Sequence, residues 1–313
     1  MSERDAERVF ILGAGRAGRS LARALRASGV EIAGLHGRRA SDGEDVIGVT
    51  TGSLPAALRR ATVVLVTVQD AALDGALGEL AAAGWTAGAG RPVVLHASGS
   101  AEPAALGALR AAGHAAGTFH PLVALAEPAR GAELLRGAWI GVDGDARAVD
   151  AARRLAARLG ARAVVIPDGS KPRYHAAAVF AANFPVVLAE LALRLMRAGG
   201  IDAEAARGAV VSLMSGAVGN LAAATPAQAL TGPVVRGDVA TIRHHLDVLA
   251  ADAATLACYT ALSAVALQIA TERGLDGDAM REIGELVRAS RSASRPTVRS
   301  ARSGRTPSPP SGE

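Results

Sequence analysis

Cysteine, lysine and aromatic residues are scarce in this chain of 313 residues. The single cysteine, Cys258, excludes an intramolecular disulfide and any cluster of cysteine ligands around a metal. Lys171 is the only lysine among 34 basic residues, so arginine replaces lysine almost throughout and its abundance alone says little about function. Aromatic residues make up 3% of the chain while half of it is apolar, which favours cores built from small side chains. The length is sufficient for two ordinary domains.

Long hydrophobic runs without polar interruption are also missing. The most apolar stretch, residues 176–193, contains Asn183, Pro185 and Glu190. We therefore expect a buried helix there and not a membrane span. The first eight residues are rich in charge, unlike the start of a signal peptide. Together these features predict a soluble cytoplasmic protein without a membrane partner.

The net charge of +5 is confined to the C-terminal end of the chain. Residues 288–313 contain six arginines and one glutamate, which leaves the rest of the chain neutral. The segment is also rich in Ser, Pro and Gly, so we expect residues 290–313 to form a disordered basic tail. A basic tail on a neutral body argues against a nucleic-acid-binding domain, although an anionic partner for the tail itself stays open as an alternative.

Short β-rich runs alternate with helical patterns over the first half of the chain. The expected strands are residues 9–12, 30–36, 46–49, 63–68, 93–96, 115–119, 138–142 and 163–166. This alternation predicts an α/β fold with a mostly parallel, doubly wound sheet. After Pro167 only helical patterns occur, at residues 171–197, 203–221, 238–249, 253–273 and 278–289. We therefore expect a sheet domain over 1–168 and a smaller all-α domain over 169–289.

A glycine-rich turn follows the first expected strand and opens a helix. Its residues are Gly13, Ala14, Gly15, Arg16, Ala17 and Gly18. The first glycine permits the tight turn, the second lets the backbone approach a pyrophosphate, and the third lets the helix pack against the sheet. In this context the motif predicts a dinucleotide-binding Rossmann domain; a glycine turn without a ligand is the alternative.

The end of the second expected strand indicates which dinucleotide is bound. NAD sites have an acidic residue there for the ribose hydroxyls, whereas this chain has Arg38 and Arg39, followed by Ser41. Two guanidinium groups can hold a 2′-phosphate. We therefore expect NADP(H) as the cofactor, with the general abundance of arginine as the competing explanation.

Further polar residues follow other strands that end at the same edge of the sheet. Gln69 and Ser98 are expected to line the nicotinamide side of the cofactor site. His120 is expected either to face the substrate or to satisfy backbone groups at a turn.

The first helical segment after Pro167 carries a cluster of polar residues. Lys171 and His175 are four residues apart and share a helix face, Tyr174 lies between them, and Asn183 follows near that face. A cation beside an imidazole can polarise a carbonyl and exchange its proton during hydride transfer. We therefore predict catalytic roles for Lys171, His175 and Asn183, against the alternative of a solvated helix start.

The loop over residues 231–238 separates two helical patterns. Arg236 in this loop is expected to bind a substrate carboxylate, and Asp238 to cap the next helix. His244 and His245 are adjacent, so their side chains point apart on a helix. No set of carboxylates or cysteines joins them as metal ligands, so we expect no metal site there.

These motifs together resemble one bacterial family. They are the glycine turn, His120-Pro121, Lys171-x-x-Tyr174-His175-Ala176-Ala177, Asn183, and Ala229-Leu230-Thr231-Gly232-Pro233-x-x-Arg236-Gly237-Asp238 with His245. This combination is similar to that of Rossmann-like proteins joined to domain of unknown function 2520. The resemblance covers about residues 8–289. It implies an NADP-dependent oxidoreductase of the 6-phosphogluconate dehydrogenase-like group, which includes ketopantoate reductases, and a homodimer formed through the helical domain. In that group a catalytic lysine is followed one turn later by Asn, where this chain has His175.

Two functional hypotheses follow from this resemblance and these residues. The first is a reductase or dehydrogenase that acts on a small 2-oxo or 3-oxo acid, for example one like ketopantoate. The second is a non-catalytic NADP(H)-binding sensor or scaffold.

Overall fold

The computed structural model describes residues 7–39, 48–84, 91–275 and 277–293, and it divides the chain into two compact units, 1–186 and 187–313. The last strand of the first unit ends at Val165, just before the domain boundary predicted at 168/169. The first unit extends beyond that boundary because it includes α6 (Lys171–Ala182), whose side chains bond to the sheet. The predicted tail lies, apart from its first residues, outside the described residues.

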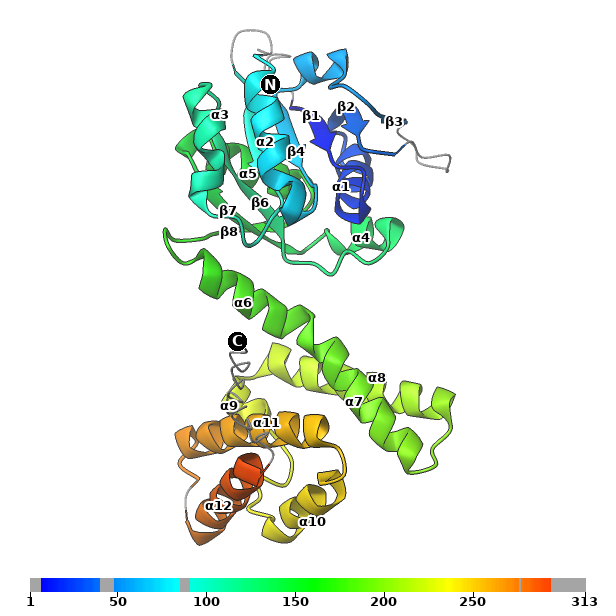
Figure 1. The fold of residues 1–313 in the computed structure, drawn as a ribbon, viewed down its shortest axis with the longest axis vertical. Coiled ribbons are helices and arrows are strands. Elements are labelled where there is room, and N and C mark those ends of the chain that lie inside the picture. Colours follow the sequence, from blue (N-terminus) through cyan, green and yellow to red (C-terminus); the bar gives the residue numbers. More distant parts are fainter. Residues whose placement is uncertain (1–6, 40–47, 85–90, 276, 294–313) are drawn as a thin grey trace, which may run out of the picture. The chain divides into compact units, whose positions relative to one another are not determined.

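The first unit is built on one eight-stranded sheet with the order β3-β2-β1-β4-β5-β6-β7-β8 (Figure 1). The strands are β1 (Arg8–Leu12), β2 (Glu31–His36), β3 (Val49–Thr50), β4 (Val63–Val66), β5 (Val93–His96), β6 (Ala116–Pro121), β7 (Trp139–Gly144) and β8 (Arg162–Val165). Every neighbouring pair is parallel except β6 and β7. The predicted α/β class with a mostly parallel, doubly wound sheet is confirmed.

Both faces of the sheet are covered by helices, as the continuous apolar runs of its strands require. Alternate residues of β1 enter different cores: Val9 and Ile11 face α1 (Arg16–Ala27) and α5 (Ala146–Arg158). Phe10 and Leu12 face α2 (Leu73–Ala82) and α3 (Gly107–Ala111). The helix α4 (Pro128–Leu134) packs against α1. The carboxyl ends of β1, β4, β5 and β6 therefore meet at one edge of a rigid sheet.

The second unit is helical, as predicted. Its helices are α7 (Phe184–Ala198), which begins just before the division, α8 (Ala203–Ala223), α9 (Pro226–Ala229), α10 (Val239–Leu249), α11 (Ala253–Glu272) and α12 (Asp278–Ala293). Ile242, Leu256 and Ile283 join α10, α11 and α12 in one core. The carboxylate of Asp238 accepts a hydrogen bond from the Thr241 N–H, as expected for the cap of α10.

The apolar stretch at residues 176–193 differs from expectation. It is split at Asn183 into α6 and α7, and its large side chains are exposed: Phe180 by 68% and Val186 by 70%. The expectation of a buried helix is therefore wrong for the single chain. Among the described residues, Lys171–Ala198 and Ala253–Glu272 are long and apolar enough to span a membrane by length and composition alone, which is weak evidence for a span.

Candidate active site

The glycine turn has the geometry that a pyrophosphate site requires. Gly13 adopts φ +120°, and a Cβ there would lie 2.6 Å from the backbone of Thr67. Gly18 contacts the carbonyl of Gly13 so closely that no side chain fits between them. Gly15 is exposed, has open space where a Cβ would project, and begins α1 without a capping side chain. The N-terminal N–H groups of α1 are thus available to an anion.

The end of β2 presents two arginines to solvent. His36 is buried and its Nδ1 lies 2.9 Å from the Thr50 hydroxyl, which ties it to β3. Arg38 and Arg39 follow and are exposed. The residue predicted beside them, Ser41, lies outside the described residues. The described part of this strand end therefore offers cations for a 2′-phosphate.

A row of polar side chains crosses three neighbouring strands and ends at Lys171. His96 of β5 is opposite Thr118 of β6, which is opposite Asp143 of β7. The Lys171 ammonium donates to the Thr118 hydroxyl at 2.6 Å and pairs with the Asp143 carboxylate at 2.9 Å. Its side chain is only 3% exposed. Lys171 therefore fastens the start of α6 to the sheet.

The protonation of His96 follows from this row. Lysine has no acceptor atom, so the Thr118 hydroxyl accepts from Lys171 and can donate its own proton to Nε2 of His96, 3.2 Å away. Burial, with a smaller contribution from the Lys171 charge, lowers the pKa of His96 to about 4. The imidazole is thus neutral near pH 7.

A second cluster lies one helical turn further along α6. The Tyr174 hydroxyl is 2.8 Å from Nδ1 of His120, and the rings of His120 and His175 are 6.1 Å apart in an edge-to-face arrangement. Gly99 follows β5, and a Cβ there would lie 2.6 Å from Nδ1 of His175 and 2.8 Å from Nε2 of His120. The missing side chain of Gly99 is therefore what lets the two imidazoles approach this strand end.

The electrostatic environment keeps His120 and Tyr174 in their neutral forms. Burial is the main cause that lowers the pKa of His120 to about 4, followed by His175 and Lys171. Burial also raises the pKa of Tyr174 to about 12, with a contribution from Asp143. A phenol hydroxyl that donates to Nδ1 leaves the His120 proton on Nε2, the nitrogen beside Gly99. Nδ1 of His175 is buried and has no hydrogen-bond partner among the described residues.

The other predicted residues lie outside these clusters. Ser98 is buried, and its Oγ accepts hydrogen bonds from the N–H groups of Ser100 and Ala101. Gln69 is exposed after β4. Asn183 is exposed at the end of α6, two helical turns or about 12 Å beyond His175. Arg236 is exposed in the second unit. The structure thus brings together His120 and His175, and it places Lys171 against the sheet.

Sequence reasoning missed three residues that shape this region. Thr118 and Asp143 hold Lys171, and Gly141 makes room for Tyr174, whose ring atom Cζ would lie 2.6 Å from a Cβ at that position. A threonine and an aspartate inside otherwise apolar strands are the available sequence signal. Their pairing, however, depends on the antiparallel register of β6 and β7, which the sequence pattern did not predict.

Two family models match the chain. Residues 8–87 match the family described as NADP oxidoreductase, coenzyme F420-dependent, and residues 138–266 match the domain of unknown function DUF2520. These matches confirm the resemblance stated from the sequence. They also confirm the predicted enzyme class, an NADP-dependent oxidoreductase, and NADP(H) as its cofactor. A search of curated proteins gave no significant match.

Solved structures share the fold. The chain is similar to protein TM1727 from Thermotoga maritima, with a TM-score of 0.65 and 24% identity over 85% of this chain and 100% of that one. For protein BF3122 from Bacteroides fragilis the TM-score is 0.63 and the identity 19%, over 91% of this chain and 98% of that one. For pyrroline carboxylate reductase from Plasmodium falciparum, crystallised with NADP bound, the TM-score is 0.56 and the identity 10%, over 93% of this chain and 99% of that one. At these identities the comparison supports the fold alone.

Proposed function

We propose that this NADP-dependent oxidoreductase transfers a hydride between NADP(H) and a small 2-oxo or 3-oxo acid, and that the reaction takes place beside His120 and His175. The observation that carries the proposal is the meeting of these two imidazoles at Gly99, three residues after the end of β5. In open α/β sheets, ligands bind outside the carboxyl ends of the strands.

The residues of the glycine turn fit the cofactor. The exposed Gly15 and the uncapped N-terminus of α1 suit a pyrophosphate, and Arg38 and Arg39 suit a 2′-phosphate. When bound, the nicotinamide supplies or accepts the hydride. Gln69 and Ser98 are proposed to line its side of the site, because both follow strands that end at the same edge of the sheet as β1.

The two histidines are suited to handle the proton that accompanies the hydride. A neutral His120 with its proton on Nε2 can donate a hydrogen bond to a substrate oxygen. Tyr174 fixes the orientation of that ring, because its hydroxyl occupies Nδ1. The unpartnered Nδ1 of His175 is a second position at which a proton can be held.

For Lys171 the contacts favour a positioning role over direct contact with the substrate. Its ammonium already has two partners in a nearly closed environment, and it would have to leave both to reach a carbonyl. By anchoring the first turn of α6, Lys171 sets the positions of Tyr174 and His175, three and four residues further on. Asn183 is retained as the residue proposed to orient the substrate, and Arg236 as the anchor of its carboxylate.

We further propose that the protein is a cytoplasmic homodimer. Large apolar side chains are exposed along α8, among them Leu213 by 67% and Val218 by 66%, and α7 buries none of its residues. Exposed apolar patches of this kind are typical of interaction sites, and the match to an NADP oxidoreductase family favours another protein chain over a membrane. A second copy of the same chain satisfies this requirement through one self-complementary surface.

Purified protein incubated with NADPH and a panel of 2-oxo and 3-oxo acids tests the catalytic proposal, with absorbance at the nicotinamide band as readout. Turnover that is lost in the His175→Ala variant and retained in a variant of an exposed residue on the same helix, Ala177→Ser, is the expected result. A cyclic imino acid is included because one structural neighbour is a pyrroline carboxylate reductase. Tight NADPH binding without turnover of any compound would favour the sensor or scaffold instead.

Sedimentation of the wild-type chain and of Leu213→Glu tests the dimer. The wild type should sediment at twice the mass of the chain, and the charged variant as a monomer with an unchanged circular dichroism spectrum. Flotation of the wild type with phospholipid vesicles would contradict the proposal and assign the apolar helices to a membrane surface.

A further inference from the structure

A carboxylate lies where the neighbouring strands β4 and β5 end, close to the two histidines of the proposed reaction site. Val66 is opposite His96 in the parallel register of these strands. Four residues further on in each strand, the Ser100 hydroxyl donates to the carboxylate of Asp70 at 2.7 Å. Asp70 begins the short 3₁₀ helix Asp70–Ala72 and is exposed. The strand pairing therefore places this carboxylate at the carboxyl edge of the sheet, where ligands bind in folds of this kind.

Gly99 connects the carboxylate to the imidazoles. It directly precedes Ser100, the residue that donates to Asp70. A Cβ at Gly99 would lie 2.6 Å from Nδ1 of His175 and 2.8 Å from Nε2 of His120. Because consecutive Cα atoms are only about 3.8 Å apart, the imidazoles and the carboxylate are separated by a distance on the order of 10 Å. A small substrate is long enough to meet both.

The charge of Asp70 acts on the proposed reaction site. Burial, followed by the charges of His175 and Lys171, lowers the pKa of His120. Among the described residues that shift this pKa, Asp70 is the one that raises it. Burial is also the main cause of the lowered pKa of His96, and Asp70 is among the groups that oppose it. A substrate beside these imidazoles would therefore lie in the field of the Asp70 carboxylate.

Asp70 is held in place by a neutral donor and not by a cation. Within the part of the chain that the structure describes, no basic side chain forms an ion pair with Asp70. The ammonium of Lys171 pairs instead with Asp143. The Ser100 N–H donates to Oγ of Ser98, which fixes the residue that orients the carboxylate. A carboxylate can accept about four hydrogen bonds, so this one retains positions for a donor on a ligand.

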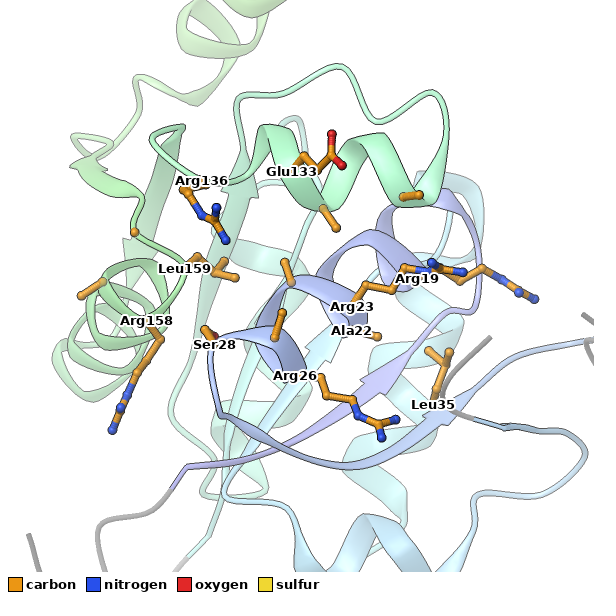
Figure 2. A pocket seen from close by; sticks show the side chains of 16 residues that line it. Arg19, Ala22, Arg23, Arg26, Ser28, Leu35, Glu133, Arg136, Arg158 and Leu159 are labelled. Atoms are coloured by element: carbon orange, nitrogen blue, oxygen red, sulfur yellow. The ribbon is translucent and has the colours of Figure 1, made fainter. Parts of the chain in front are cut away.

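A pocket of about 770 Å³ between α1, α4 and the end of α5 does not bear on the charge of the substrate (Figure 2). Its lining does not include Asp70 or either histidine of the proposed site. The arginines of α1 that line it already have interactions within the chain: Arg19 donates to the carbonyl of Ala14, and Arg23 acts on the charge of Glu127. The charge that bears on substrate choice is therefore that of Asp70.

We propose that Asp70 determines substrate specificity, and that the substrate is a small oxo acid which also carries a protonated amino group. This inference rests on the function proposed above, with the carbonyl of the substrate beside His120 and its ammonium group on Asp70. An ammonium group donates up to three hydrogen bonds, and a bond between charged groups is about twice as strong as a neutral one. A hydroxyl group in the same position would supply a donor and leave the carboxylate without a counter-charge.

Calorimetric titration of two matched acids tests the inference. In 4-amino-2-oxobutanoate an ammonium group takes the place of the terminal methyl group of 2-oxopentanoate, and the two molecules have the same length. The protein is first saturated with NADP+, which has no hydride to give to an oxo acid, so affinity is measured apart from turnover. We expect the amino compound to bind at least about fivefold more tightly, as an ion pair at an exposed carboxylate allows. The neutral donor 4-hydroxy-2-oxobutanoate should bind more weakly than the amino compound.

Two variants show whether Asp70 is the cause. Asp70→Asn keeps an acceptor for the Ser100 hydroxyl and should abolish the preference for the amino compound. The matched control Asp74→Asn removes an exposed carboxylate of α2, four residues further on, and should retain the preference. Both variants should bind NADP+ as the wild type does. A loss of NADP+ affinity in Asp70→Asn would overturn the inference, because the carboxylate would then belong to the cofactor site.

The other results separate this inference from the proposed function. Equal affinity for the two matched acids overturns it, as does tighter binding of the hydroxy compound or a preference that survives Asp70→Asn. A preference lost equally in Asp74→Asn also overturns it, since that result indicates general attraction between charges. Turnover with NADPH is measured separately. Preferential binding without reduction of either acid would contradict the proposed hydride transfer and support recognition by Asp70, whereas reduction of both acids with equal affinity would contradict the recognition alone.

Discussion

Replacing Lys171 by methionine separates a positioning role from a catalytic one. The change removes the buried cation and leaves the Asp143 carboxylate, 12% exposed, without its partner. Breaking a buried ion pair on one side costs about 3–5 kcal/mol. For a unit of this size, each kcal/mol corresponds to roughly 2–4 °C in Tm, so we expect the Tm to fall by about 6 °C or more. Thermal unfolding followed by circular dichroism measures this directly.

Two further variants complete the experiment. Arg173→Met changes an exposed cation on the same turn of α6 and should alter stability by no more than about 0.5 kcal/mol. Adding Asp143→Leu to Lys171→Met removes the stranded carboxylate and should restore more than half of the lost stability, since apolar replacement of both partners is often neutral. A Lys171→Met protein that keeps the wild-type Tm and loses only turnover would refute the reasoning. It would indicate that Lys171 contacts the reacting atoms directly.

Three other predictions follow from the same geometry. The pKa of His96 is about 4 in the folded chain, against 6.5 for an ordinary histidine, so the unfolded chain binds more protons between these pH values. The free energy of unfolding should therefore fall by on the order of 3 kcal/mol as the pH drops from about 6.5 to 4. Urea unfolding at several pH values measures this fall, which should be smaller in the His96→Gln variant. Gly141→Ala forces the ring of Tyr174 to move and should cost about 1–3 kcal/mol, whereas Gly78→Ala, at an open helical position, should be neutral or stabilising in the same melting assay. Replacing Arg38 and Arg39 by alanine should weaken NADPH at least about tenfold while leaving NADH unchanged in fluorescence titrations, and equal losses for both would place the 2′-phosphate elsewhere.

The fold was readable from the sequence because its signals are local. Continuous apolar runs such as residues 63–66 are buried on both faces, as parallel strands are. The glycine turn lies where a strand, a turn and a helix N-terminus must follow one another, so its geometry is largely set by its own residues. The helix break at Asn183 was missed although Pro185 signals it, because the apolar pattern continues across the break.

The site was less readable, because its contacts depend on register. His96, Thr118 and Asp143 are more than 20 residues apart in sequence from one to the next, and they form a row only because β6 pairs with β5 in parallel and with β7 in antiparallel fashion. A shift of one residue in β7 would turn Asp143 to the other face and leave Lys171 without its counter-charge. The same register sets Gly141 opposite His120, where the Tyr174 hydroxyl meets Nδ1. The sequence therefore predicted the helix that carries Lys171 and His175. The roles that we propose, anchoring by Lys171 and proton handling by His175 of α6 and His120 of β6, depend on the strand pairing, which the sequence pattern did not predict.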